Sequence, residues 1–238
     1  MIKTLLIDEC RFLAFRPVSP AVHTHWRAFL AFGLFFTWLA GVGRYWDNPR
    51  AELWQTLGLG SVVYVFALAL IIWALLAPLR PRNWSYRNVL LFLTLTAPPA
   101  VLYAIPVETF MDAGAARATN AWFLAVVATW RVALLAVFLK RAAGLSLGAV
   151  VVATLLPLTI IVVALSTLNL EHVVFDVMSG IREEERGPND DAYGVVFLLS
   201  MLSFMCAPVL ASVYLALVQR ARRGGQQGAG ADTAPPRR

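Results

Sequence analysis

A single arginine, Arg131, lies inside a long apolar segment and is the residue whose position most strongly suggests chemistry. The predicted span covers 121–139, so Arg131 is at mid-depth, where inserting an arginine costs about 2.5–3.5 kcal/mol. No acidic residue is expected deep in another span, because the nearest, Glu108 and Glu171, lie at the outer ends of theirs. Backbone carbonyls are therefore the expected partners of Arg131.

Prolines in other spans would expose such carbonyls. The prolines near the middles of spans are Pro98, Pro99, Pro157 and Pro208. Pro98 and Pro99 have no backbone N–H groups, so they cannot donate the helical hydrogen bonds to the carbonyls of Thr94 and Leu95. Broken helices around a mid-membrane charge are also how many transporters form a binding site. Two hypotheses stay open: Arg131 joins kinked helices structurally, or it serves a solute, a lipid headgroup or a proton.

A second group of polar residues follows the fifth predicted span. Glu171, His172 and Asp176 lie on an expected amphipathic helix at the outer surface, with His172 and Asp176 four residues apart on one face. A histidine with carboxylates could bind a metal or act in acid–base catalysis. The alternative is the polar face of an interfacial helix, a pattern that arises often by chance.

Two glycines at the start of the fifth predicted span have the small-xxx-small spacing. Gly144 and Gly148 would let two helix backbones approach closely, inside the chain or with a partner. This spacing indicates packing and not chemistry. The sequence shows no phosphate-binding glycine loop and no paired cysteine and histidine spacing, so no cofactor or metal is predicted.

The elements that position these residues are apolar helices long enough to cross a bilayer. The chain is 59% hydrophobic and only 14% charged, and a hydrocarbon core of about 30 Å needs roughly 20 apolar helical residues. The runs do not alternate as barrel strands do, so helices are expected. The fold class is all-α, a polytopic bundle of six predicted spans: 28–43, 57–79, 89–107, 121–139, 145–168 and 193–218.

The charges between these spans sort by sign. The N-terminus, the loops at 80–87 and 140–144, and the C-terminal tail hold fourteen of the twenty lysines and arginines but only three of the fourteen acids. Cytoplasmic loops carry the excess of lysine and arginine, so both termini are predicted to be cytoplasmic. The net charge of +6 then follows from topology, and a nucleic-acid partner is not expected.

Three regions are expected along the chain. Residues 1–25 form a cytoplasmic N-terminal segment, either an interfacial helix with Ile2, Leu5, Leu6, Phe12 and Leu13 on one face or a frayed terminus. Residues 26–219 form the transmembrane domain. Residues 220–238 form a basic tail whose glycine-rich part is expected to be flexible.

One stretch of the chain resembles a known family. The residues Trp130, Leu134, Leu135, Gly144-Leu145-Ser146 and Pro157 resemble Yip1-type membrane proteins, including their small bacterial relatives. In those proteins a tryptophan-bearing span leads through a short G-L-S turn to a proline-containing span, and the match covers about 121–165. The resemblance implies a helical membrane bundle that acts as a scaffold, with no catalytic residues to transfer.

Three functions are consistent with these observations. The first is a non-enzymatic scaffold or accessory subunit of a membrane complex, with the lipid bilayer and a membrane protein or a second copy as partners. The second is a transporter of a small solute or ion through Arg131, Pro98, Pro99 and Pro157. The third is a membrane enzyme using Glu171, His172 and Asp176, although the sequence favours no enzyme. A bacterial cytoplasmic membrane is the expected location.

Overall fold

Helices account for all the regular secondary structure in residues 1–46, 52–170 and 191–231, which are the residues that the computed structural model describes. Five helices are long and apolar enough to cross a membrane, and a bent pair of shorter helices makes a sixth if it is one span. The prediction of an all-α fold with several helices able to span a membrane is confirmed. The elements are α1 (Ile2–Leu13), α2 (Ala21–Thr24), α3 (Trp26–Tyr45), α4 (Leu53–Thr56), α5 (Leu59–Leu76), η1 (Ala77–Leu79), α6 (Tyr86–Leu95), η2 (Pro98–Ala104), η3 (Val107–Thr109), α7 (Ala113–Arg141), α8 (Leu147–Thr167) and α10 (Asp191–Ala231).

The third predicted span, 89–107, is broken. The helix α6 ends at Leu95, and η2 leaves it at an angle of 45°. Because Pro98 and Pro99 have no N–H to donate, the chain cannot continue the α-helical hydrogen bonds. It tightens instead into a 3₁₀ helix, in which Ala100 N–H donates to the carbonyl of Ala97 over 2.8 Å.

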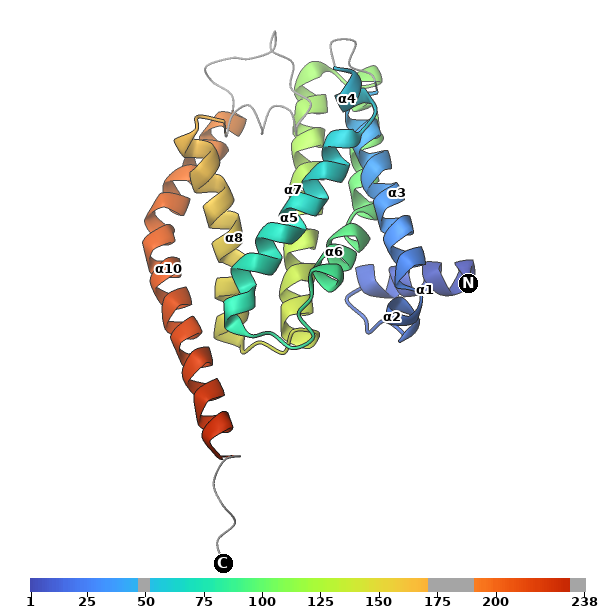
Figure 1. Cartoon of the computed structure of the whole chain (residues 1–238). Coiled ribbons are helices and arrows are strands. Elements are labelled where there is room, and N and C mark those ends of the chain that lie inside the picture. The colour runs from blue at the N-terminus through green and yellow to red at the C-terminus, as the bar shows by residue number, and fades with distance from the viewer. Residues whose placement is uncertain (47–51, 171–190, 232–238) are drawn as a thin grey trace, which may run out of the picture.

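The core of the bundle lies where α5, α6, α7 and α8 meet (Figure 1). Phe92 of α6 stacks on Phe138 of α7, with ring centroids 4.3 Å apart. Leu76, Val89 and Leu139 are among the buried side chains that fill the same region. This packing fixes α7 against the broken α6–η2 pair.

Small residues let α3 approach the broken pair closely. A Cβ on Gly33 would lie 2.6 Å from Thr94 Cβ, and a Cβ on Gly43 would lie 2.4 Å from Ala104 Cβ. Both distances are shorter than carbon atoms tolerate, so only glycine fits. The sequence analysis did not single out this contact.

The helices α8 and α10 form a pair on the other side of the bundle (Figure 1). Ser166 and Ser200 join them through a hydroxyl–hydroxyl hydrogen bond of 2.8 Å. The helix α10 continues to Ala231, and the expected flexibility of the tail stays a prediction.

The helix α1 runs across one end of the bundle rather than along it (Figure 1). Of the apolar residues expected on one face, Leu5 is buried and Ile2 and Leu6 are exposed. The buried side of α1 instead includes two acids, Asp8 and Glu9, which are 1% and 4% exposed.

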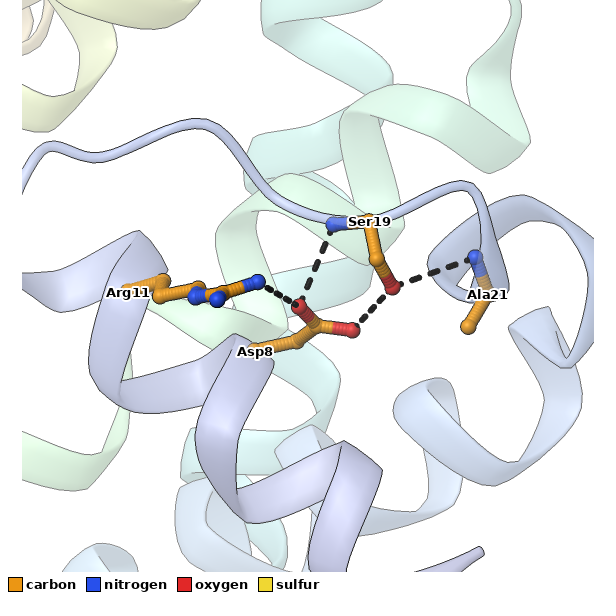
Figure 2. Close-up of polar contacts among 4 residues, drawn as sticks. All are labelled: Asp8, Arg11, Ser19 and Ala21. Carbon is orange, nitrogen blue, oxygen red and sulfur yellow. Dashed lines mark hydrogen bonds and ion pairs between the residues drawn. The ribbon is translucent and has the colours of Figure 1, made fainter.

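Asp8 connects α1 to the segment before α2 (Figure 2). Its carboxylate accepts the backbone N–H of Ser19 over 3.1 Å and also the Ser19 hydroxyl, and it pairs with Arg11 at 3.8 Å. The Ser19 hydroxyl oxygen in turn accepts the N–H of Ala21 over 3.3 Å. These bonds orient the segment that contains Pro17 and Pro20.

Candidate functional site

Arg131 lies deep within the apolar length of α7. The helix runs from Ala113 to Arg141, so Arg131 is ten residues before its C-terminal end. At a rise of about 1.5 Å per residue this places its Cα roughly 15 Å along the axis from that end. The side chain is partly buried.

The side chain of Arg131 bonds to the break in the third span. Its Nε donates to the carbonyl oxygen of Thr96 over 3.0 Å. That carbonyl is available because its α-helical donor, Ala100 N–H, bonds to Ala97 instead. The partner of Arg131 is therefore a backbone carbonyl, as expected. The residue that provides it is Thr96, and not Thr94 or Leu95. Among the described residues this is the one hydrogen bond that Arg131 makes.

A second arginine lies in electrostatic range of the first. Arg44, in the last turn of α3, interacts with Arg131 as a like charge. Its guanidinium carbon lies 5.1 Å from the centroid of the Tyr103 ring in η2, a cation–π contact. The Nε of Arg44 is buried and has no hydrogen-bond partner within the described part of the chain.

Two tyrosines complete the group, which we call the arginine–tyrosine site: Arg44, Tyr64, Tyr103 and Arg131. Both tyrosines interact electrostatically with both arginines. Tyr103 is partly buried, and Tyr64 of α5 is exposed on the outer surface of the bundle. The site therefore draws on four elements, α3, α5, η2 and α7.

The site holds more positive charge than its surroundings balance. In the ranges 1–46, 52–170 and 191–231, the only ion pair formed by described side chains joins Arg11 and Asp8. Arg44 and Arg131 thus rely on an aromatic ring and a carbonyl. The guanidinium groups of these two arginines are of the kind that binds anions through charge-assisted hydrogen bonds.

The other sequence-predicted residues do not gather at this site. Pro157 is buried within α8, and the hydrogen bond that Arg131 makes goes to Thr96, just before η2, rather than to α8. Pro98 and Pro99 contribute indirectly, by freeing the Thr96 carbonyl.

The two predicted packing glycines behave differently from each other. Gly144 has a φ of +67° in the turn between α7 and α8, and its neighbour is the side chain of Arg82. A Cβ on Gly148 would meet nothing within 4 Å. Packing of Gly148 against another helix of this chain is therefore not observed, and contact with a partner stays a prediction.

The predicted outer cluster of Glu171, His172 and Asp176 lies outside the described residues. Within the residues that are described, no group of three or more histidine, cysteine and acidic side chains could hold a metal ion.

Comparison with known proteins gives no relative. No family model, curated protein or solved structure matches the chain. The resemblance of 121–165 to Yip1-type proteins therefore has no support from these comparisons.

Sequence reasoning missed Arg44, Tyr64 and Tyr103 as parts of a site. Arg44 lies just beyond the predicted first span, 28–43, whereas α3 continues to Tyr45 and includes it. The tyrosines carried no distinguishing signal, since single tyrosines are common near span ends.

Proposed function

We propose that the chain is an integral membrane protein that binds a small anionic solute at the arginine–tyrosine site and moves it across the bilayer. The observation that supports this proposal is the pair of arginines, Arg44 and Arg131, without carboxylate partners among the described side chains. A buried charged donor that lacks a partner is costly, and a bound anion would remove that cost.

A purely structural role for Arg131 explains less. One hydrogen bond to Thr96 is enough to join α7 to the broken pair. It does not account for a second arginine, Arg44, in range of the first, because like charges repel. An anion between the two would be attracted by both.

The test is anion flux into liposomes that contain only the purified protein. The probes are chloride, inorganic phosphate and acetate, and the variants are Arg131→Gln and Arg44→Gln. The glutamine amide at 131 can still donate to the Thr96 carbonyl, so the variant removes the charge and keeps the structural contact. Arg16→Gln is the matched control, because Arg16 is exposed and far from the site in sequence.

We expect flux of at least one probe in the wild type and the control, and about a tenfold or greater loss in both site variants. Absence of flux for all three probes in the wild type contradicts the proposal. So does full flux in Arg131→Gln. Arg131→Leu removes both the charge and the contact, and degradation of that variant alone would support the structural role.

We further propose that both termini are in the cytoplasm and that the membrane is a bacterial cytoplasmic membrane. The distribution of lysine and arginine supports this orientation. Reporter fusions at residues 84 and 188 should report opposite compartments. If they report the same one, the orientation and the span count both fail.

A second candidate, a scaffold or accessory subunit of a membrane complex, is favoured by α10. Almost none of the residues in its apolar part, Phe197–Arg223, are buried inside the chain. A membrane-protein partner or a second copy could cover this face in place of lipid. A partner that co-purifies in mild detergent at fixed stoichiometry, and is lost when α10 is removed, would support this candidate over transport.

A further inference from the structure

A cavity opens at the end of the bundle where η1, the turn at 142–146 and α8 come together. Its volume is about 250 Å³. That is several times the roughly 30 Å³ that one water molecule occupies in the liquid. The residues that line it come from η1, the loop after it, the turn before α8, the start of α8 and α10.

The walls of the cavity are held by backbone bonds. The N–H of Arg82 donates to the carbonyl of Ala143 over 2.9 Å, which joins the loop after η1 to the turn before α8. In that turn, Leu145 N–H donates to Leu139 over 3.1 Å. Gly144 adopts a left-handed conformation, and the Arg82 side chain lies over the place where a Cβ would be. The cavity is therefore preformed.

The polar part of the cavity is cationic. Arg80 and Arg82 line it, and no acidic residue does. Neither arginine forms an ion pair with any described side chain. The Ser146 hydroxyl oxygen accepts the N–H of Ala149 over 3.4 Å, which leaves the hydroxyl hydrogen free to donate. The first N–H groups of α8 emerge at the same end and favour negative charge.

The remaining wall is apolar and comes partly from another helix. Leu79, Leu145 and Ala149 continue it, and Leu217 of α10 closes one side. A cavity lined by both cationic and apolar side chains matches a molecule that carries a phosphate and a hydrocarbon chain. A free phosphate would use only the cationic part.

We propose that this cavity binds the phosphate headgroup of an anionic phospholipid, with Arg80 and Arg82 as ligands and an acyl chain along Leu217. Basic cavities between transmembrane helices on the cytoplasmic side bind such headgroups in other membrane proteins. The cavity lies among loops that the charge distribution assigns to the cytoplasm. Neither Arg44 nor Arg131 lines the cavity. The lipid-binding proposal can therefore be tested independently of the transport proposal.

The test is native mass spectrometry of the full-length protein released from nanodiscs of equal phosphatidylglycerol and phosphatidylcholine. We expect phosphatidylglycerol to be retained in preference to phosphatidylcholine by the wild type. Each of Arg80→Gln and Arg82→Gln should reduce that retention about fivefold. Arg82→Lys should keep most of it, because the charge remains. Arg223→Gln is the control, since Arg223 is exposed and does not line the cavity.

A second measurement distinguishes the two sources of phosphate and requires no variant. Thermal unfolding in detergent is followed with added phosphatidylglycerol and, separately, with inorganic phosphate at the same concentration. A rise in Tm with the lipid alone supports the proposal. An equal rise in Tm with inorganic phosphate would contradict the assignment of the ligand as a lipid. In the mass spectrometry experiment, equal retention of the two lipids by the wild type would contradict the proposed binding site.

Discussion

Trp130 donates its indole N–H to the carbonyl oxygen of Leu13 over 3.0 Å and so joins two residues that are 117 positions apart. The ring of Phe15 stacks on the same indole, with centroids 6.4 Å apart. Arg141 also donates to the carbonyl of Phe15. The end of α1 is therefore fastened to α7 at the residue that precedes Arg131.

The first prediction concerns this contact. Trp130→Phe removes the hydrogen bond and keeps an aromatic ring for Phe15, so it should weaken the attachment of α1 by about 1 kcal/mol. Hydrogen exchange should show faster exchange of the amides in 2–13 and unchanged exchange in α8. Trp122→Phe, at an exposed position of the same helix, is the control. Unchanged exchange in α1 would show that the bond does not hold the helix.

The second prediction concerns Glu9 and pH. Burial raises the pKa of its carboxyl from 4.5 to about 8, and neither carboxylate oxygen has a hydrogen-bond partner among the described residues. A carboxyl whose pKa is higher in the docked state binds more protons there. The docking of α1 is therefore strongest below pH 4.5 and weakens as the pH rises, until it levels off above about 8.

The measurement is the hydrogen-exchange protection of 2–13 at pH 6 and pH 9, normalised to α8 in the same sample. Protection should be lower at pH 9 in the wild type. Glu9→Gln cannot ionise, so its protection should be the same at both pH values. A wild type without this difference would mean that Glu9 is not buried in solution.

The third prediction compares two glycines. Gly33→Ala places a Cβ 2.6 Å from Thr94, including contact with its backbone, and should destabilise the protein by about 1–3 kcal/mol. Gly148→Ala places a methyl group in open space within α8 and should be neutral or stabilising by up to about 1 kcal/mol. Thermal unfolding in one detergent checks both. Equal Tm values for the two variants would contradict the close approach of α3 to α6.

The fourth prediction concerns the broken span. Pro98→Ala together with Pro99→Ala restores two N–H donors and favours a continuous helix. In such a helix the Thr96 carbonyl would bond to Ala100, and Arg131 would lose its acceptor. The proline changes and Arg131→Leu, which removes the contact with Thr96, should therefore be non-additive in Tm by the equivalent of about 0.5–3 kcal/mol. Strict additivity would show that the bend and Arg131 are independent.

The helical class and most spans could be predicted from the sequence because hydropathy is a property of each segment alone. The carbonyl partner of Arg131 could also be anticipated, since Pro98 and Pro99 remove donors wherever the chain folds. The choice of Thr96 could not, because it depends on a 3₁₀ hydrogen bond from Ala100. Neither could the partnership of Arg44 with Tyr103, which depends on how α3 crosses η2.

The burial of Glu9 could not be predicted from the sequence for a different reason. Its position beside Asp8 and Arg11 is typical of a solvated face, and in the sequence it indicated no burial. In the structure α1 lies across the bundle with Asp8 and Glu9 buried and Arg11 exposed, an arrangement fixed by contacts with Ser19 and Trp130. Such contacts join distant parts of the chain, and helical periodicity carries no information about them.

The position of α10 at the edge of the helical bundle has a consequence for the order in which the helices assemble during synthesis. Its packing within the described chain is mainly against α8 and η1, together with the bond from the Tyr214 hydroxyl to Leu75. The helices α3, α5, α6 and α7 make their mutual contacts without it. Because synthesis proceeds from the N-terminus, this inner group can assemble while the ribosome is still translating the last helix, which then joins a body that is already formed.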